Sequence, residues 1–271
     1  MTLAQTLPTK ADEAWRYADL KAVESIWQAV EAHEPIVVTA GEKAVQSLIL
    51  DAGEARMRRL HIVLEEDARI DLACLATAPQ YGRIDIRAKL PQGQGTWSAI
   101  WMLPENNSYG SWATSGEIDI LEAVNLGVAC EKCPGGKENT ILGTLHFGGK
   151  WPDNKLASTE VSLPGSLDEF HTYSIIWDEG RFQWLVDGKL FATKHAKDWS
   201  TTSSDDANAP FDKPFHLILN LAIGGKLPEE RGIGGLSEQG FPKRMEIDFV
   251  RVWKCNAEAD SDASCKGRGT D

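Results

Sequence analysis

Three carboxylates lie close together in SGEIDILEAVN, residues 115–125: Glu117, Asp119 and Glu122. Residues two apart in a β-strand share a face, so Glu117 and Asp119 point the same way. Glu122 follows Glu117 by five places and would point to the other face of a regular strand. One extra residue, a β-bulge within 120–122, brings all three carboxylates to one face. We therefore predict a bulge at this point.

Paired carboxylates of this kind suit the hydrolysis of a glycosidic bond. One carboxylate attacks the anomeric carbon, and the other is protonated to help the leaving oxygen depart. Asp119 between them raises the cost of ionising its neighbours, which favours a protonated acid near neutral pH. The alternative is the solvated face of an amphipathic strand, with Ile118 and Ile120 in the core. Such a face more often alternates the signs of its charges, because like charges on one face repel.

Strand patterns surround the carboxylates from Tyr81 onward. Runs rich in Val, Ile, Leu and aromatic residues alternate with Gly, Pro and Asn, as in ILGTLHFGG, FHTYSIIWD and FHLILNLAIGG. VDGK, which joins FQWLV to LFATK, is typical of a two-residue hairpin. Many strands with little helix between them predict an all-β fold, an antiparallel sandwich or jelly roll.

The first 76 residues differ in character. Apolar residues at near-helical spacing predict an amphipathic helix over 10–33, and IVVTA, SLILDA and RRLHIVLEEDARIDLACL are typical of strands. We expect an atypical N-terminal segment (1–76), a β-sandwich domain (77–255) and a polar tail (256–271). The N-terminal strands either complete the sandwich or form a separate appendage.

Composition excludes several classes of protein. The 271 residues are 42% hydrophobic and 25% charged, which is enough for a packed core. The net charge of -12 argues against a nucleic-acid partner. No apolar run approaches the ~18 residues of a membrane span, and the N-terminus lacks the apolar region of a secretory signal.

Five cysteines cannot all pair within one chain. CEKC at 130–133 could be a tight disulfide, half of a zinc site or two free thiols. Cys255 and Cys265 flank the polar tail and could close a loop, and Cys74 completes the five.

Several segments closely resemble the catalytic core of glycoside hydrolase family 16, the laminarinase-like endo-β-1,3-glucanases. They are YGRIDIRAKLPQGQGTWSAIWMLPENNSYGSWATSGEIDILEAVN, GTLHFGGKWPDN, FHTYSIIWDEGRFQWLVDGK, PFHLILNLAIGG and MEIDFVRVW, within about residues 80–254. The motif Glu-x-Asp-x-x-Glu is specific in this context. The resemblance implies Glu117 as nucleophile, Glu122 as acid/base and Asp119 as an assisting group. It implies a β-jelly roll with a sugar-binding groove on its concave face, and no cofactor for the chemistry.

Aromatic and amide side chains are the expected sugar contacts. Two tryptophans in GTWSAIWMLP are four residues apart and share a strand face, where the alternative to sugar stacking is core packing. A third precedes the carboxylates in GSWATSGE, and the histidine of GTLHFGG matches one beside the catalytic centre of the family. His171 and His216 are interpreted as structural. The expected substrate-binding residues are Trp97, Trp101, Trp112, His146, Asn107 and Asn220.

Asp248, in MEIDFVRVW, matches an aspartate that helps to hold a structural calcium ion in many family members, together with backbone oxygens of the N-terminal strands. Calcium takes six to eight oxygens, so such a site depends on the N-terminal segment. That segment departs from the family. Residues 7–73 resemble instead the SufD family of iron–sulfur cluster assembly scaffold proteins.

The resemblance therefore implies a monomeric, retaining endo-hydrolase of β-1,3-glucosidic bonds in laminarin-like β-glucans, with mixed-linkage β-1,3-1,4-glucan as a second substrate. By family analogy its place is extracellular. The alternative is a β-glucan-binding module of the same fold without catalysis, although such modules usually lack the catalytic Glu pair. A third class, an iron–sulfur assembly factor, depends on the N-terminal segment alone.

Overall fold

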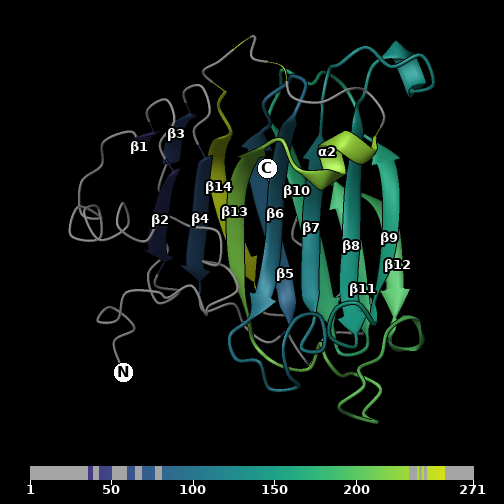
Figure 1. The fold of residues 1–271 in the computed structure, drawn as a ribbon. Coiled ribbons are helices and arrows are strands. Elements are labelled where there is room, and N and C mark those ends of the chain that lie inside the picture. The colour runs from purple at the N-terminus through teal and green to yellow at the C-terminus, as the bar shows by residue number, and fades with distance from the viewer. Residues whose placement is uncertain are drawn as a thin grey trace.

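Two β-sheets pack face to face in the computed structural model (Figure 1). The structure describes residues 36–38, 43–50, 60–64, 69–76, 81–231, 237, 240 and 243–253. The elements are β1 (Ile36–Val38), β2 (Lys43–Leu50), β3 (Leu60–Leu64), β4 (Arg69–Ala76), β5 (Gly82–Lys89), β6 (Thr96–Pro104), β7 (Glu117–Val124), η3 (Pro134–Gly136), β8 (Thr140–Gly148), β9 (Asn154–Ser162), β10 (His171–Asp178), β11 (Arg181–Val186), β12 (Lys189–His195), η4 (Ala196–Asp198), β13 (Phe215–Ile223), α2 (Lys226–Glu230) and β14 (Glu246–Trp253).

The carboxylates lie on a central strand of one sheet. This sheet has the order β2-β4-β13-β6-β7-β8-β9, and the second has the order β1-β3-β14-β5-β10-β11-β12. The pairs β1–β3 and β2–β4 are parallel, and the other described pairs are antiparallel. The all-β antiparallel sandwich is thus confirmed. The expected helix over 10–33 and the tail over 256–271 lie outside the described residues.

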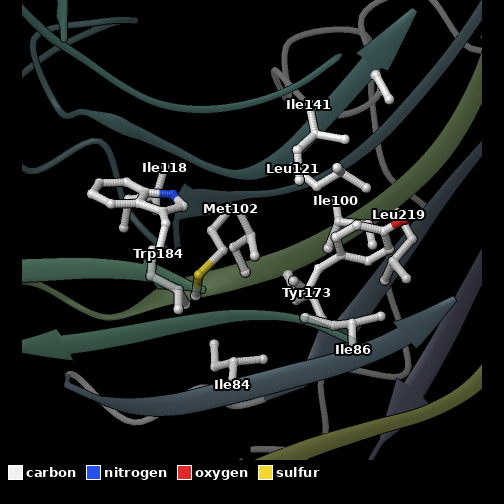
Figure 2. Packing of buried hydrophobic residues seen from close by; sticks show 14 of the residues in the cluster. Ile84, Ile86, Ile100, Met102, Ile118, Leu121, Ile141, Tyr173, Trp184 and Leu219 are labelled. Atoms are coloured by element: carbon white, nitrogen blue, oxygen red, sulfur yellow. The ribbon is translucent and has the colours of Figure 1, made fainter. Parts of the chain in front are cut away.

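The core fills the space between the sheets. Ile100 and Ile118 of the carboxylate-bearing sheet meet Tyr173 and Trp184 of the other sheet, and all four side chains are buried (Figure 2). An aromatic cluster continues this core, with edge-to-face contacts of Phe211 with Phe182 and Trp199. Burial of one large apolar side chain contributes roughly 1.5–3 kcal/mol, so this layer supplies much of the stability that holds the sheets together.

The N-terminal strands extend both sheets at one edge. β4 pairs with β13 and β3 pairs with β14, while β2 and β1 add outside them. Ile36 pairs with Ile62 and Lys43 with Arg69, which is an offset of 26 residues in both sheets. The chain therefore alternates between the two sheets, as one turn of a parallel coil stacked on the sandwich.

Cys130 and Cys133 form a disulfide, which decides between the alternatives for CEKC and excludes free thiols or half a zinc site. Cys255 and Cys265 lie outside the described residues. Within the part of the chain that the structure describes, no helix has the length and apolar character needed to cross a membrane.

We predict that the limit fragment of proteolysis retains β3 and β4. Loss of β3 and β4 would expose the backbone groups of β14 and β13 at two sheet edges. Mass spectrometry of the limit fragment, with its melting temperature, measures this. A stable fragment that begins near residue 77 and melts at an unchanged temperature would show instead that the N-terminal strands are an appendage.

Candidate active site

The strand that carries the carboxylates leaves regular register after Asp119. Asp119 pairs with Thr144 of β8, and the next pair is Glu122 with Leu142. Three steps along β7 therefore oppose two steps along β8, which defines a bulge. The register with β6 shifts at the same place. This confirms the bulge predicted from the spacing of the acidic residues.

The bulge is held from the core side. Ile120 and Leu121 are both buried in the core, so the extra residue is accommodated there. Trp184 of β11 donates its indole N–H to the backbone carbonyl of Asp119 at 2.8 Å. Gly143 leaves room for this ring, since a Cβ at that position would lie 2.6 Å from Trp184 Cδ1. The backbone carbonyl at the start of the bulge thus has a hydrogen-bond partner inside the core.

The opposite face holds a compact polar cluster. His146 Nε2 lies 3.2 Å from Asp119 Oδ2 and 3.6 Å from Glu117 Oε1. Among the described residues, Glu117, Asp119 and His146 are the one group of three ligating side chains whose polar atoms all lie within 4.8 Å of one another. The Asp119 side chain is 3% exposed, and that of Glu117 is 14% exposed. The cluster is therefore mostly buried, and Glu117 is more accessible to solvent than Asp119.

Each glutamate receives an indole hydrogen bond from a different element. Trp112, on the loop before β7, donates to Glu117 Oε2 at 2.7 Å. Trp97, on β6, donates to Glu122 Oε1 at 3.0 Å. The Trp112 ring also lies 5.5 Å from the ring of His146. Both indoles thus orient carboxylate oxygens, whereas sugar stacking by their rings stays a prediction.

Burial is the main electrostatic influence on the carboxylates. It raises the pKa of Glu117 and of Asp119 well above their usual values, and the charge of Asp119 raises the pKa of Glu117 further. Burial also raises the pKa of Glu122, an effect partly offset by the Trp97 hydrogen bond and the charge of His146. Crowded, desolvated carboxylates cannot all ionise together. The direction of these shifts favours a protonated carboxyl group in the cluster, as a general acid requires.

The remaining candidates divide into those on the carboxylate face and those away from it. Trp101 is half-buried and donates its indole N–H to Asn220 Oδ1 at 2.8 Å, so these two brace each other on the face. Asn107 is exposed on the loop after β6, and among the described residues its side chain makes no hydrogen bond to the cluster. Burial lowers the pKa of His216 to about 4, so this histidine is neutral, and His171 is held by Asp187.

Asp248 forms an ion pair with an arginine side chain of the second sheet. Arg87 Nη1 lies 2.5 Å from Asp248 Oδ2, on neighbouring strands of the second sheet. Among the described residues, no further acidic or histidine side chains join Asp248 in a ligand group. The described side chains therefore do not fit a calcium ion, and the calcium site stays a prediction that rests on the N-terminal segment.

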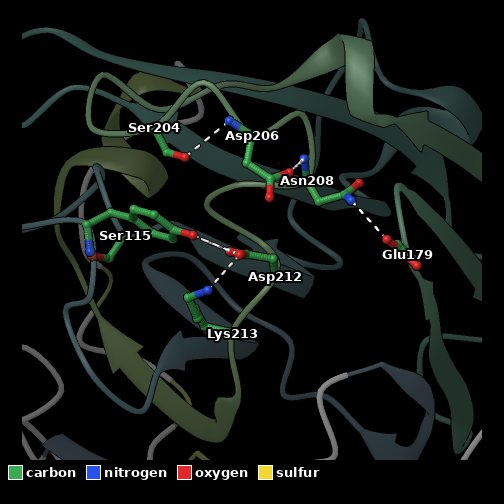
Figure 3. A network of polar contacts seen from close by, with 8 residues as sticks. Ser115, Glu179, Ser204, Asp206, Asn208, Asp212 and Lys213 are labelled. Atoms are coloured by element: carbon green, nitrogen blue, oxygen red, sulfur yellow. Dashed lines mark hydrogen bonds and ion pairs between the residues drawn. The ribbon is translucent and has the colours of Figure 1, made fainter.

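A polar network supports the loop that carries Trp112, and the sequence analysis did not find it. Tyr109 Oη donates to Asp212 Oδ2 at 2.7 Å, and Lys213 Nζ donates to the same oxygen at 2.7 Å (Figure 3). Ser115 accepts the backbone N–H of Tyr109 at 3.0 Å. The loops before β7 and before β13 are thereby joined. No local pattern signals this, because Tyr109 and Asp212 are 103 residues apart.

A comparison with protein families matches residues 76–251 to the model described as glycosyl hydrolases family 16. The chain is 42% identical over 181 residues to glucan endo-1,3-beta-glucosidase A1 of Niallia circulans, covering 65% of this chain and 24% of that protein. It is 37% identical over 180 residues to a beta-glucanase of Rhodothermus marinus, covering 64% of this chain and 57% of that protein.

Two further matches bear on the alternatives. A beta-1,3-glucan-binding protein of Penaeus monodon is 36% identical over 229 residues, with 65% of this chain and 59% of that protein covered. The X-ray structure of the Rhodothermus marinus laminarinase superposes with a TM-score of 0.52 at 34% identity, covering 65% of this chain and 66% of that one. The chain spans less than two thirds of the length of each of these curated relatives.

We predict that Trp184→Phe lowers the free energy of unfolding by about 1–3 kcal/mol more than Trp199→Phe does. Both indoles are buried, but Trp199 Nε1 has no hydrogen-bond partner among the described residues, whereas Trp184 satisfies the Asp119 carbonyl. Denaturant unfolding of both variants measures the difference. Equal losses would mean that the hydrogen bond at the bulge contributes nothing beyond ring packing.

We further predict that Asp212→Asn raises the amide hydrogen-exchange rates of residues 109–116 by about tenfold, because their loop loses its charged partner. Asp206→Asn is the matched control, since Asp206 lies on the same loop and accepts from Asn208 N–H. Mass spectrometry of exchanged peptides reports both. Unchanged exchange in Asp212→Asn would remove this network from the support of Trp112.

Proposed function

The chain belongs to glycosyl hydrolases family 16, and we propose that it is a retaining endo-hydrolase of β-1,3-glucosidic bonds in laminarin-like β-glucans. Mixed-linkage β-1,3-1,4-glucan is the proposed second substrate. The observation that carries the proposal is the bulge, which sets two indole-bonded glutamates on one strand face with Asp119 between them. The match to proteins named glucan endo-1,3-beta-glucosidase and beta-glucanase supports the choice of substrate.

In the first proposed step, a Glu117 oxygen attacks the anomeric carbon and forms an ester as the glycosidic C–O bond breaks. Glu122 gives its proton to the departing oxygen. Burial and the charge of Asp119 raise the pKa of Glu117, while the charge of His146 and the hydrogen bond from Trp112 act in the opposite direction and favour the ionised carboxylate that attack requires. The buried position of Glu122 favours its protonated form before the step.

In the second step, Glu122 is ionised and acts as a base. It takes a proton from water, the hydroxyl oxygen attacks the anomeric carbon, and the ester bond to Glu117 breaks. Two inversions give net retention of configuration at that carbon. Asp119 lies beside His146 and Glu117, and we assign it the role of controlling where the shared proton resides as charge moves between the glutamates.

The half-buried rings of Trp97 and Trp101 lie on the same strand face as the glutamates and are the proposed platforms for glucose units. Aromatic rings suit the apolar faces of sugars, while Asn220 beside Trp101 offers an amide to hydroxyl groups. The chain is proposed to act as a monomer.

The second candidate function is β-glucan binding without hydrolysis. The match to a protein named beta-1,3-glucan-binding protein favours it. The presence of both glutamates, each with its indole donor, favours hydrolysis. Binding alone does not need two buried carboxylates that share a proton.

We predict that the chain releases reducing sugar from laminarin and that Glu117→Gln lowers the rate by about a thousandfold or more. The amide cannot form the ester, yet it leaves the shape of the site unchanged. Glu179→Gln is the control, since Glu179 is exposed and pairs with Asn208. No release by the unchanged chain would reject hydrolysis and favour binding. Release at the full rate by Glu117→Gln would reject Glu117 as the nucleophile.

A further inference from the structure

The segment over 224–231, which follows β13 and contains α2, crosses the face of the sheet that carries the glutamates (Figure 1). Hydrogen bonds connect this segment to the rest of the protein at several points. The Gly224 N–H donates to the Gly95 carbonyl at 2.7 Å. The Asn125 side chain, which is buried at the end of β7, donates to the Pro228 carbonyl at 2.9 Å. The segment therefore has a defined position above the sheet.

The near end of this segment contacts the indole that holds Glu122. A Cβ at Gly225 would lie 3.2 Å from Trp97 Cζ3, so the backbone of Gly225 rests against that ring. Trp97 in turn donates to Glu122 Oε1. Displacement of the segment would free the ring and, with it, the hydrogen bond that orients Glu122.

The far end is fixed to the edge strand β9 by Arg231. Its two terminal nitrogens donate to the two carboxylate oxygens of Glu160 at 2.9 and 3.2 Å. Such a two-pronged contact is the strongest geometry available to an arginine and a carboxylate. The Arg231 side chain is 20% exposed, so its charge is only partly screened by water.

This ion pair lies in the same cross-strand row as Glu122. Glu122 pairs with Leu142, and Leu142 pairs with Glu160, so the three side chains share a face. Two inter-strand spacings separate the ends of the row, which amounts to about 10 Å. At that distance a partly desolvated charge still acts on a carboxylate.

We propose that Arg231 is a positioning residue for the reaction, which holds the segment over 224–231 on Trp97 and places a positive charge beside Glu122. This inference rests on the proposed function of Glu122 as acid/base. The charged groups on the face of Glu122 are Glu117 and Asp119 from its own strand, His146 from β8, Glu160 from β9 and Arg231 from the segment. The negative charge of Glu160 acts against that of Arg231, and loss of Arg231 leaves it unopposed, so both effects raise the Glu122 pKa. Burial raises the Glu122 pKa, and the charge of Arg231 is one of the influences that lower it.

The direction of the change in the Glu122 pKa can be predicted from the charge of Arg231. Arg231 stabilises the ionised form of Glu122, so its neutral replacement raises the Glu122 pKa. The alkaline limb of the pH profile of kcat/KM reports loss of the proton from the acid of the free enzyme. Removal of the charge in Arg231→Gln therefore moves this limb upward, by about half a pH unit after screening. Release of the segment also lowers kcat more than it raises KM.

The test compares pH profiles on laminarin for the unchanged chain, Arg231→Gln, Arg231→Lys and Lys226→Gln. Lys226 is the matched control, because it lies on the same segment, carries the same charge and is 85% exposed in its pair with Glu230. We expect the alkaline limb of the kcat/KM profile to lie at higher pH in Arg231→Gln than in the unchanged chain. In Arg231→Lys, which keeps the positive charge, and in Lys226→Gln we expect it at the same pH as in the unchanged chain. A Carbon-13 titration of the Glu122 carboxyl group, with and without Arg231→Gln, measures the same shift without substrate.

Two results would overturn the inference. One is a limb and a Glu122 titration that are the same in Arg231→Gln as in the unchanged chain. The other is an equal shift in Lys226→Gln, which would reflect net charge rather than position. Failure of the proposed function is a separate outcome: the unchanged chain would release no sugar, while the carboxyl titration would still decide the role of Arg231.

Discussion

The indole N–H of Trp184, which meets the Asp119 carbonyl inside the core, is the interaction on which the arrangement of the site depends. A bulge in a central strand leaves a backbone group without its ladder partner, and a dry core offers no water to replace it. Trp184 supplies the donor from the opposite sheet, and Gly143 gives its ring the space it needs. The same side chain, Trp184, therefore packs the core and stabilises the bulge that brings the three carboxylates to one face.

Two chain connections, one before β13 and one after it, contribute to the support of the two glutamates. Glu117 depends on Trp112, whose loop is joined to the loop before β13 through Tyr109 and Asp212. Glu122 depends on Trp97, which lies under the segment that follows β13. Connections at opposite ends of β13 thus position the two carboxylates separately.

Sequence reasoning reached the parts of the site that follow from strand periodicity. The spacing of Glu117, Asp119 and Glu122 predicted the bulge, and the four-residue spacing of Trp97 and Trp101 predicted their common face. It did not reach the contacts that tertiary folding alone creates. Arg231 meets Glu160 across 71 residues, and the indole N–H of Trp184 reaches the bulge across 65 residues. No local pattern marks such pairs. The ion pair of Asp248 with Arg87 is of the same kind, since the two residues lie on neighbouring strands but are 161 residues apart in the sequence.

The parallel coil formed by β1 to β4 has a consequence for how this architecture can change. Every turn of such a coil presents the same pair of strand edges, one turn further out, at a repeat of 26 residues. Whole turns can therefore be gained, lost or exchanged without altering the edge offered to β13 and β14. β13 and β6 also lie between the coil and β7, so they separate the strand that carries the three carboxylates from that edge. The sandwich thus has one edge at which strands can be added or lost, while β7, three strands from β4, keeps its register.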